Sequence, residues 1–194
     1  MSVWWLLVPV SYVVGGFPTA HLIGLLTGTD PTAEGSGNPG ASNMYRVAGR
    51  RAGVAVLIGD VLKGFVPAAL GYLADGRPLG VACGIAAMVG HVFPITRGFR
   101  GGGKGVATLS GACCFLYPLV SLGLFVVWVL TMRLSRTASL GSLAMAVLLP
   151  VGIAIRGYPA WEVVAMGLAA GVVILRHWSN IRRIASNEEH LISE

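Results

Sequence analysis

Three polar stretches of the chain carry residue types that suit a phosphate-bearing ligand. They are EGSGNPGASNMYR (34–46), GFRGGGKG (98–105) and RHWSNIRR (176–183). Glycines leave backbone N–H groups accessible to an anion, and Arg, Lys, Asn and Ser side chains add further hydrogen-bond donors. The chemistry that the three stretches share predicts a site for an anionic ligand that carries phosphate.

The first stretch has the spacing of a dinucleotide fingerprint, G-x-G-x-x-G, at residues 35–40, and Asp60 lies 20 residues after the last glycine. That fingerprint needs a strand before it and a helix after it, within one βαβ unit. Here an apolar run long enough for a membrane-spanning helix precedes it, and Asp60 lies inside a second apolar run. The context therefore excludes a Rossmann site.

The second stretch is close to a P-loop, because Gly98, Gly103 and Lys104 fit G-x-x-x-x-G-K. Gly105 stands where a Ser or Thr would bind magnesium, and no acidic partner for a metal is evident. Two interpretations remain, a flexible basic loop facing anionic headgroups and a metal-free loop that cradles phosphate where a helix begins at Gly105. We favour the cradle, and we expect neither a metal nor a cofactor.

Ionisable residues also occur within or beside the apolar runs. Asp60 and Lys63 lie one helical turn apart, and ionisable groups at membrane depth usually face a partner or a cavity. They form either a local ion pair that holds the helices together or a pair in which Asp60 orients Lys63 toward a pocket. His91 and His177 lie near span ends beside basic stretches and are candidates for catalysis, whereas His21 is expected to be structural.

The elements that hold these residues must be membrane helices. Of the 194 residues, 55% are hydrophobic and 11% are charged, and the mean hydropathy is +0.74. A soluble domain carries about 25% charged residues, because its surface must be solvated. We therefore predict an all-α polytopic membrane protein with one integral-membrane domain over residues 1–194, and we expect no nucleic-acid partner.

The charges between the apolar stretches predict the topology. Tyr117 and Pro118 separate two of the stretches, which form either one long helix or a tight pair of short ones. With seven spans, eleven Lys and Arg residues fall on one side and only Arg77 and Arg156 fall on the other. Because cytoplasmic loops carry the excess of Lys and Arg, we predict seven spans, an external N-terminus and a cytoplasmic C-terminus. The stretches are 3–26, 52–74, 79–96, 105–117, 118–132, 138–155 and 159–175.

Five motifs follow one another along the chain: GSGNPGASNMYR (35–46), DVLKG (60–64), GHVFP (90–94), GGKGVAT (102–108) and RHWSNIRR (176–183). They resemble the motifs of the bacterial acyl-phosphate:glycerol-3-phosphate acyltransferases, the PlsY family. The resemblance implies a polytopic inner-membrane enzyme of phospholipid synthesis that transfers a fatty acyl group from acyl phosphate to the sn-1 hydroxyl of glycerol 3-phosphate, giving lysophosphatidic acid. Acyl-CoA and acyl carrier protein are not direct donors in that family. This chain departs from the pattern at Ser42, at the extra Gly101 and at TDPTAE (29–34), where basic residues are more usual.

The resemblance and the residue chemistry together name the expected site. We expect catalysis to involve His91, Lys104, Ser36, Asn43 and Arg46. We expect the substrates to be bound by Asn38, Gly40, Lys63, Gly102, Gly103, Gly105, Ser142, His177 and Asn180, with Asp60 and Arg183 in support. The polar pocket would hold the phosphates at the cytoplasmic rim, and a groove walled by Gly and Ala would take the acyl chain.

The expected mechanism is direct acyl transfer without an acyl-enzyme. The sequence contains neither an evident Ser-His-Asp set nor the H-x-x-x-x-D pair of the common glycerolipid acyltransferases. Acyl phosphate is already activated, so the protein has to align the hydroxyl with the carbonyl and stabilise the developing charge. His91 is the first candidate for general base, and a substrate phosphate oxygen is its rival.

The expected partners are glycerol 3-phosphate, acyl phosphate and the lipid bilayer, and a soluble acyl-phosphate synthase is a further candidate. The expected location is the bacterial inner membrane, with the active site facing the cytoplasm. A transporter for an anionic solute is the competing class, but it would carry polar residues near the midplane and on both sides, often in an inverted repeat. A member of the same family with a different acyl donor also stays open.

Overall fold

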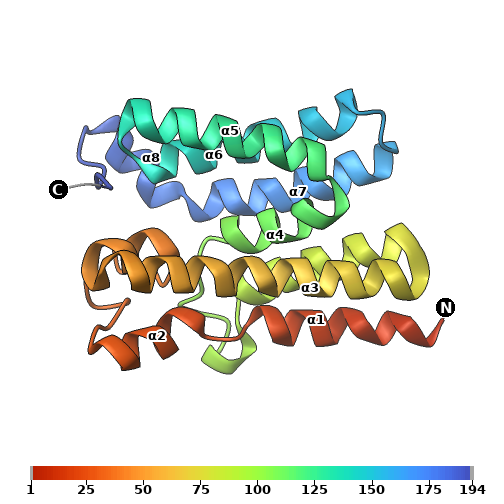
Figure 1. Cartoon of the computed structure of the whole chain (residues 1–194), viewed down its shortest axis with the longest axis horizontal. Coiled ribbons are helices and arrows are strands. Elements are labelled where there is room, and N and C mark those ends of the chain that lie inside the picture. Colours follow the sequence, from red (N-terminus) through yellow and green to blue (C-terminus); the bar gives the residue numbers. More distant parts are fainter. Residues whose placement is uncertain (1, 193–194) are drawn as a thin grey trace. The chain divides into compact units, whose positions relative to one another are not determined.

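The computed structural model describes residues 2–192 and is all-helical over that range, as predicted (Figure 1). Met1, Ser193 and Glu194, which the single-domain prediction includes, lie outside the described residues. The elements are the 3₁₀ helices η1 (Val3–Leu6) and η2 (Ile95–Arg97) and the α-helices α1 (Leu7–Gly15), α2 (Thr19–Thr27), α3 (Ala41–Val92), α4 (Val106–Leu116), α5 (Pro118–Ser135), α6 (Ala138–Ile155), α7 (Ala160–Arg176) and α8 (Trp178–Ala185).

The chain divides into two compact units, Met1–Leu116 and Tyr117–Glu194. The boundary lies at the predicted break between the fourth and fifth apolar stretches. Tyr117 has non-helical backbone angles (φ −138°, ψ 59°), so α4 ends before it and α5 starts at Pro118. Proline suits a first helical position, because its missing N–H has no partner there in any case. The two stretches are therefore separate helices rather than one long one.

In the first unit, α3 is interrupted at Gly49 and again at Asp75 and Gly76, and at the second break the chain folds back on itself (Figure 1, at the yellow end of α3). Asp75 and Gly76 leave the helical region, and Gly76 has a φ of +76°, a left-handed angle that glycine adopts without strain. A side chain at Gly71 would collide with the carbonyl group of Leu79, which shows how closely the two halves approach. The predicted stretches 52–74 and 79–96 thus correspond to the two arms of one hairpin.

The other helices of the first unit pack on this hairpin through small residues. Gly90 lies against the backbone of Tyr12 in α1, and Gly111 of α4 lies against the backbone of Val61. Small residues let helix backbones approach closely, which is how helices associate within a bilayer. The N-terminal run is broken at Pro18, so α1 and α2 are separate short helices around a bend.

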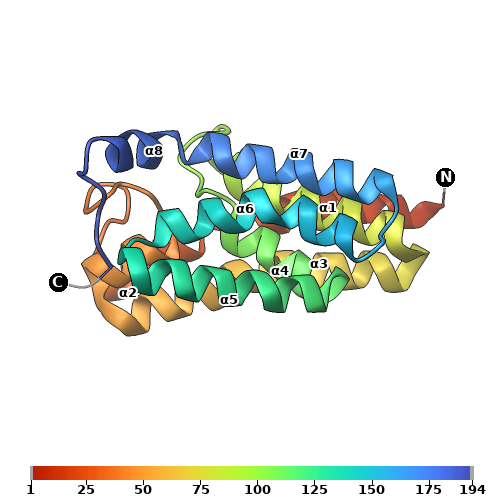
Figure 2. The same cartoon turned by 90° about the horizontal axis from the view of Figure 1, so that it is seen from above.

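In the second unit, α5, α6 and α7 follow one another as neighbouring helices. The hydroxyl of Tyr117 donates a 2.7 Å hydrogen bond to Glu162, a fully buried residue in the first turn of α7. The α8 axis is bent by 56° from that of α7, and Figure 2 shows the short helix set off across this bend. Beyond α8, the backbone N–H of Ile192 donates to the carbonyl of Arg136, so the C-terminal tail returns to the α5–α6 loop.

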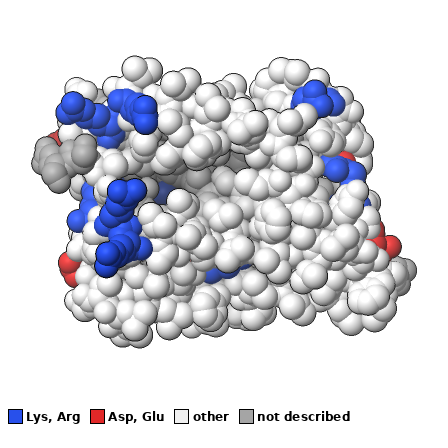
Figure 3. All heavy atoms as spheres, viewed as in Figure 1, with Lys and Arg blue, Asp and Glu red and all other residues white. Residues whose placement is uncertain are grey.

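Length and composition identify four helical runs within residues 2–192 that can cross a membrane, or five if the bent pair of α7 and α8 counts as one span. The run Ala41–Arg97 contains two of the seven predicted spans, and the 11-residue α4 falls below the length criterion. Figure 3 shows Lys and Arg gathered near the helix ends of each unit, with few along the helices. Large apolar side chains such as Leu26 and Leu134 are more than 80% exposed, as in an integral membrane protein whose helices face lipid.

Candidate active site

The side chain of Asn43 organises the loop between α2 and α3. Its Nδ2 donates to the carbonyls of Pro31 and Glu34, both at 3.0 Å, and its Oδ1 accepts the backbone N–H of Ser36 at 2.9 Å. Asn43 is only 1% exposed. Since both amide hydrogens and one or more lone pairs are used within the protein, these contacts favour a loop-holding role for Asn43 over direct contact with a ligand.

Arg46 and Ser36 lie next to the Asn43 side chain. The Nη2 of Arg46 is 3.4 Å from both Ser36 Oγ and Asn43 Oδ1. Both residues are half-buried, so they stay accessible from one side. Asn38 and Gly40 are also half-buried, and the N–H of Gly40 donates to the carbonyl of Asn38 across a tight turn before α3. The structure thus brings the predicted residues of the first motif together where the α2–α3 loop meets the start of α3.

The acidic approach to this loop has a local structural role. Asp30 Oδ1 accepts hydrogen bonds from the backbone N–H of Thr32 at 2.8 Å and from its hydroxyl at 2.6 Å. These two hydrogen bonds from Thr32 hold the pKa of the Asp30 carboxyl below its usual value. The carboxylate of Glu34 in turn accepts the N–H of Asp30. The segment TDPTAE (29–34), where the chain departs from the motif pattern, therefore supplies hydrogen bonds within the loop.

The glycine-rich loop 98–105 packs directly on the end of α3. The N–H of Gly103 donates to the carbonyl of His91 at 3.2 Å. A side chain at Gly102 would collide with the carbonyls of His91 and Val92, and one at Gly103 would collide with the His91 ring. Glycine is required at these two positions, because the loop lies in contact with α3. Lys104 follows at once, and Gly105, with a φ of +84°, turns the chain into α4.

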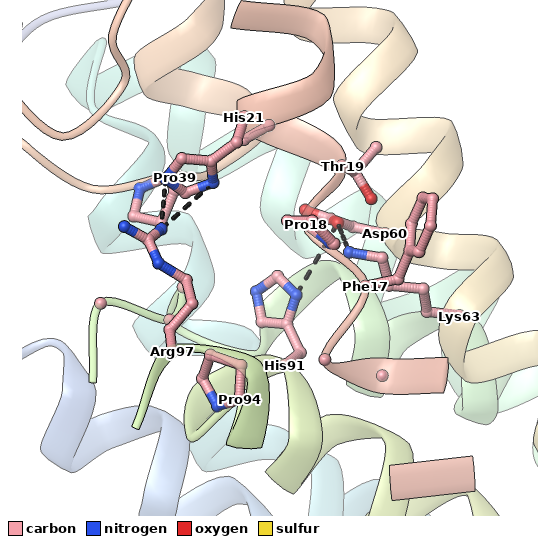
Figure 4. A pocket seen from close by; sticks show the side chains of 16 residues that line it. Phe17, Pro18, Thr19, His21, Pro39, Asp60, Lys63, His91, Pro94 and Arg97 are labelled. Carbon is pink, nitrogen blue, oxygen red and sulfur yellow. Dashed lines mark hydrogen bonds and ion pairs between the residues drawn. The ribbon is translucent and has the colours of Figure 1, made fainter. Parts of the chain in front are cut away.

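Asp60, Lys63 and His91 meet in a pocket of the first unit (Figure 4). Lys63 Nζ donates to Asp60 Oδ1 at 2.7 Å, and His91 Nδ1 lies 3.7 Å from the same oxygen. All three residues are at most 9% exposed. The ion pair of the first interpretation is present, and both of its members line the pocket as the second interpretation required. The two interpretations are therefore compatible.

His21 and Arg97 form the opposite wall of this pocket, and sequence reasoning missed them (Figure 4). Arg97 Nη1 lies 3.2 Å from His21 Nδ1 and also contacts Nε2, so His21 has a polar partner outside its own helix. The partners are 76 residues apart, and helical spacing cannot show such a contact. A usable signal was Pro18, because a proline in an apolar run marks a helix break where irregular backbone can line a cavity.

The predicted residues of the second unit gather at one end of that unit. His177 is 2% exposed, and its Nδ1 lies 2.8 Å from the carbonyl of Val173. Since a carbonyl only accepts, this contact places a hydrogen on Nδ1, and Nε2 is the acceptor in the neutral ring. Ser142 donates its hydroxyl to the carbonyl of Ala138 at 2.8 Å, so its oxygen is left to act as an acceptor.

Asn180 and Arg183 share a carboxylate partner that sequence reasoning did not identify. Glu189, beyond the end of α8, accepts from Asn180 Nδ2 at 2.8 Å through Oε1 and from Arg183 Nε at 3.2 Å through Oε2. Arg183 was predicted to support the site, and this contact is consistent with that role. Among residues 2–192, the structure has no group of three or more His, Cys, Asp and Glu side chains that could hold a metal ion.

Comparisons with known proteins identify the family. The sequence profile of the family described as "Glycerol-3-phosphate acyltransferase" matches residues 5–187. A glycerol-3-phosphate acyltransferase of Trichlorobacter lovleyi is 42% identical over 180 residues, which cover 92% of each chain. One from Pseudomonas aeruginosa is 41% identical over 194 residues, covering 96% of this chain and 98% of the relative. This chain belongs to the glycerol-3-phosphate acyltransferase family.

The family's fold is also that of a solved structure, described as PlsY, an integral membrane glycerol 3-phosphate acyltransferase. Its glycerol 3-phosphate form superposes with a TM-score of 0.93 and 33% identity, over 98% of this chain and 96% of that one. Its lysophosphatidic acid form gives a TM-score of 0.91. The family resemblance and the prediction of an all-helical integral membrane protein are confirmed.

Proposed function

We propose that this chain transfers a fatty acyl group from acyl phosphate to the sn-1 hydroxyl of glycerol 3-phosphate, forming lysophosphatidic acid for phospholipid synthesis. The observation that carries this proposal is the family membership together with a structural relative solved in both its glycerol 3-phosphate and its lysophosphatidic acid forms. The choice of acyl phosphate as donor rests on the motif resemblance. The reaction takes place at the cytoplasmic face of the cell membrane.

The phosphate groups are held by cationic side chains and by glycine-rich backbone. Arg46, near the start of α3, contacts Ser36 of the α2–α3 loop, and Lys104 follows the two glycines packed on α3. Charge-assisted hydrogen bonds from Arg and Lys are roughly twice as strong as neutral ones. Asn43 acts through the loop whose backbone it holds. Asn38, Gly40, Gly102, Gly103, Gly105, Ser142, His177 and Asn180 complete the proposed binding residues.

The acyl group is transferred directly between the two substrates, without an acyl-enzyme. The sn-1 oxygen attacks the acyl carbonyl carbon, the bond from that carbon to the phosphate oxygen breaks, and inorganic phosphate leaves. The hydroxyl proton passes to His91 or to a phosphate oxygen. His91 is suited to accept it, because Asp60 lies 3.7 Å from its Nδ1 and stabilises a protonated ring. Lys63 shares that carboxylate and keeps the buried charges paired.

One assay tests the proposal. The purified protein, in detergent or lipid, is incubated with glycerol 3-phosphate and either palmitoyl phosphate or palmitoyl-CoA, and lysophosphatidic acid is followed by mass spectrometry. Product from palmitoyl phosphate alone is the expected result. Product from the CoA ester alone would overturn the donor assignment, and product from neither would overturn the function. His91→Ala separates the two proton acceptors, because a positioned base contributes about 10²–10⁴ in rate. Near-wild-type kcat in this variant would assign the proton to phosphate.

The proposed orientation is tested by labelling. Arg156 follows α6 and Ser186 follows α8, and both are exposed. In a chain whose three native cysteines are replaced by alanine, single cysteines at these positions are treated with a membrane-impermeant maleimide in intact spheroplasts. We expect Arg156→Cys to be labelled from outside and Ser186→Cys to be labelled only after permeabilisation. The reverse pattern would place the C-terminus outside.

A further inference from the structure

Arg97 lies at the rim of the pocket in the first unit, at the end of η2. Its backbone N–H donates to the carbonyl of Pro94 at 3.1 Å, which closes a short 3₁₀ turn after α3. The guanidinium reaches across to α2, where Nη1 lies 3.2 Å from His21 Nδ1 and also contacts Nε2 (Figure 4). Arg97 is exposed, whereas Lys63 and His91 in the same pocket are buried, so the arginine stands at the open end of the pocket.

The positive charge of Arg97 is not neutralised within the part of the chain that the structure describes. Among those residues, its side chain contacts the His21 ring and has no carboxylate partner. The carboxylate of the pocket, Asp60, instead lies 2.7 Å from Lys63 and 3.7 Å from His91. A ring nitrogen that accepts a hydrogen bond carries no proton, so His21 orients the guanidinium without cancelling its charge. The pocket therefore has an excess of positive charge.

Lys63 adds further donors in the interior of the same pocket. Its ammonium group carries three hydrogens, and Asp60 Oδ1 is its hydrogen-bond partner among residues 2–192. The hydroxyl of Thr19, which also lines the pocket, has no hydrogen-bond partner in that range. Buried polar groups are normally hydrogen-bonded, so donors of this kind suit a ligand with several acceptor oxygens.

We propose that Arg97 binds the phosphate group of a substrate at the mouth of this pocket, and that His21 is the positioning residue that directs the guanidinium. The contact with His21 is made by Nη1, so the edge formed by Nε and Nη2 can bind two phosphate oxygens at once. Gly101 lies against that edge, because a Cβ there would be 3.8 Å from Nε and 3.7 Å from Nη2. A larger side chain at 101 would cover the edge, whereas glycine leaves it open.

This role of Arg97 rests on the proposed function and adds two residues to its site. The pocket that Arg97 lines is also lined by four residues assigned to that site, Lys63, His91, Gly102 and Gly103. Both substrates carry a phosphate, which glycerol 3-phosphate brings from water and acyl phosphate brings from the membrane. The chemistry of recognition at Arg97 is the same for either, and kinetics with the two substrates separate them.

The test compares the KM for glycerol 3-phosphate with the KM for palmitoyl phosphate. Arg97→Gln removes the charge and the forked donor, and we expect it to raise one of these KM values about tenfold and to leave the other within about twofold. The substrate whose KM rises is the one that Arg97 binds. Arg51→Gln is the matched control, because Arg51 is exposed in the same unit and is not a lining residue of the pocket. The control should change neither KM.

Two variants of His21 test the positioning role. His21→Leu has no acceptor for Arg97 Nη1 and should raise the same KM about three- to fivefold with kcat unchanged. His21→Gln keeps an acceptor oxygen and should hold that KM within about twofold of wild type. In the Arg97→Gln background, His21→Leu should add less than about twofold, because the guanidinium that it would misdirect is absent.

Three results would overturn the binding role of Arg97: no rise in either KM in Arg97→Gln, equal rises in both, or the same effect in Arg51→Gln. A full additional effect of His21→Leu in the Arg97→Gln background would overturn the positioning role of His21. If Arg97→Gln cannot be purified, Arg97→Lys decides, because it keeps the charge without the fork: a rise of about threefold in one KM supports the proposal and wild-type values refute it. Failure of the proposed function itself looks different, since the wild-type chain then forms no lysophosphatidic acid.

Discussion

Replacing Asn43 by alanine should disorder the α2–α3 loop. The substitution leaves three backbone groups without their present partner, the N–H of Ser36 and the carbonyls of Pro31 and Glu34. A lost intramolecular hydrogen bond costs about 1 kcal/mol, so the ordered loop loses about 3 kcal/mol relative to its open form. That corresponds to a change on the order of 10²-fold in the equilibrium between the ordered and open loop.

Hydrogen exchange measures this change directly. In detergent-solubilised protein, peptides covering residues 30–40 should exchange up to about 10²-fold faster in Asn43→Ala than in wild type. The kcat/KM for glycerol 3-phosphate should fall in parallel, because Arg46 and Ser36 depend on the same loop for their position. Ser42→Ala, one residue earlier and half-buried, removes none of these hydrogen bonds and should leave both measurements unchanged.

A dissociation of the two measurements would refute the reasoning. If Asn43→Ala lost activity while the exchange of residues 30–40 stayed as in wild type, Asn43 would be a direct ligand of the substrate. If the loop exchanged faster while activity was retained, the ordered loop would not be needed for the reaction. Either outcome would remove Asn43 from its proposed place as the residue that holds the loop.

Three further predictions concern close packing and buried polar contacts. Gly103→Ala places a Cβ against the His91 ring and should lower kcat/KM by about 10–100-fold, because overpacking costs about 1–3 kcal/mol. The control Gly171→Ala, whose added Cβ has no atom within 4 Å, should leave the kinetics unchanged. Asp60→Leu alone leaves Lys63 buried without this partner and should lower the free energy of unfolding by about 3–5 kcal/mol. Adding Lys63→Met should restore most of the stability but not the activity, and a double variant as unstable as Asp60→Leu would contradict this. Tyr117→Phe removes a buried hydrogen bond to a carboxylate and should lower stability by about 1–3 kcal/mol with both KM values unchanged, so a changed KM would contradict its purely structural role.

The helices were predictable because a bilayer imposes long apolar runs with few charges. The break at Tyr117 and Pro118 was visible in the sequence as a proline between two apolar stretches, and the structure separates the helices there. The turn at Asp75 and Gly76 also falls between two predicted spans, 52–74 and 79–96. How closely the helices approach one another was not predictable, because it depends on which glycines face a neighbouring backbone, as Gly111 faces Val61.

The site was predictable in its residue types but not in its contacts. Asp60 and Lys63 are three residues apart on a helix, so their pairing followed from helical spacing. His21 and Arg97 are joined only by the fold, since α2 and η2 meet across the pocket. Glu189 lies in a polar tail after α8, and its approach to Asn180 depends on one left-handed residue that the sequence does not single out.

Asn43 and Asn180 share a feature that bears on how the proposed phosphate-binding motifs work. In each amide, Nδ2 donates to oxygen atoms of the protein itself, two carbonyls for Asn43 and a carboxylate for Asn180. Both Nδ2 hydrogens of Asn43 are used within the protein, and its Oδ1 accepts the N–H of Ser36, so Asn43 has no donor left for a phosphate. The donors for phosphate must then come from Arg46, Lys104 and the glycine backbone, which carry positive charge or unhindered N–H groups.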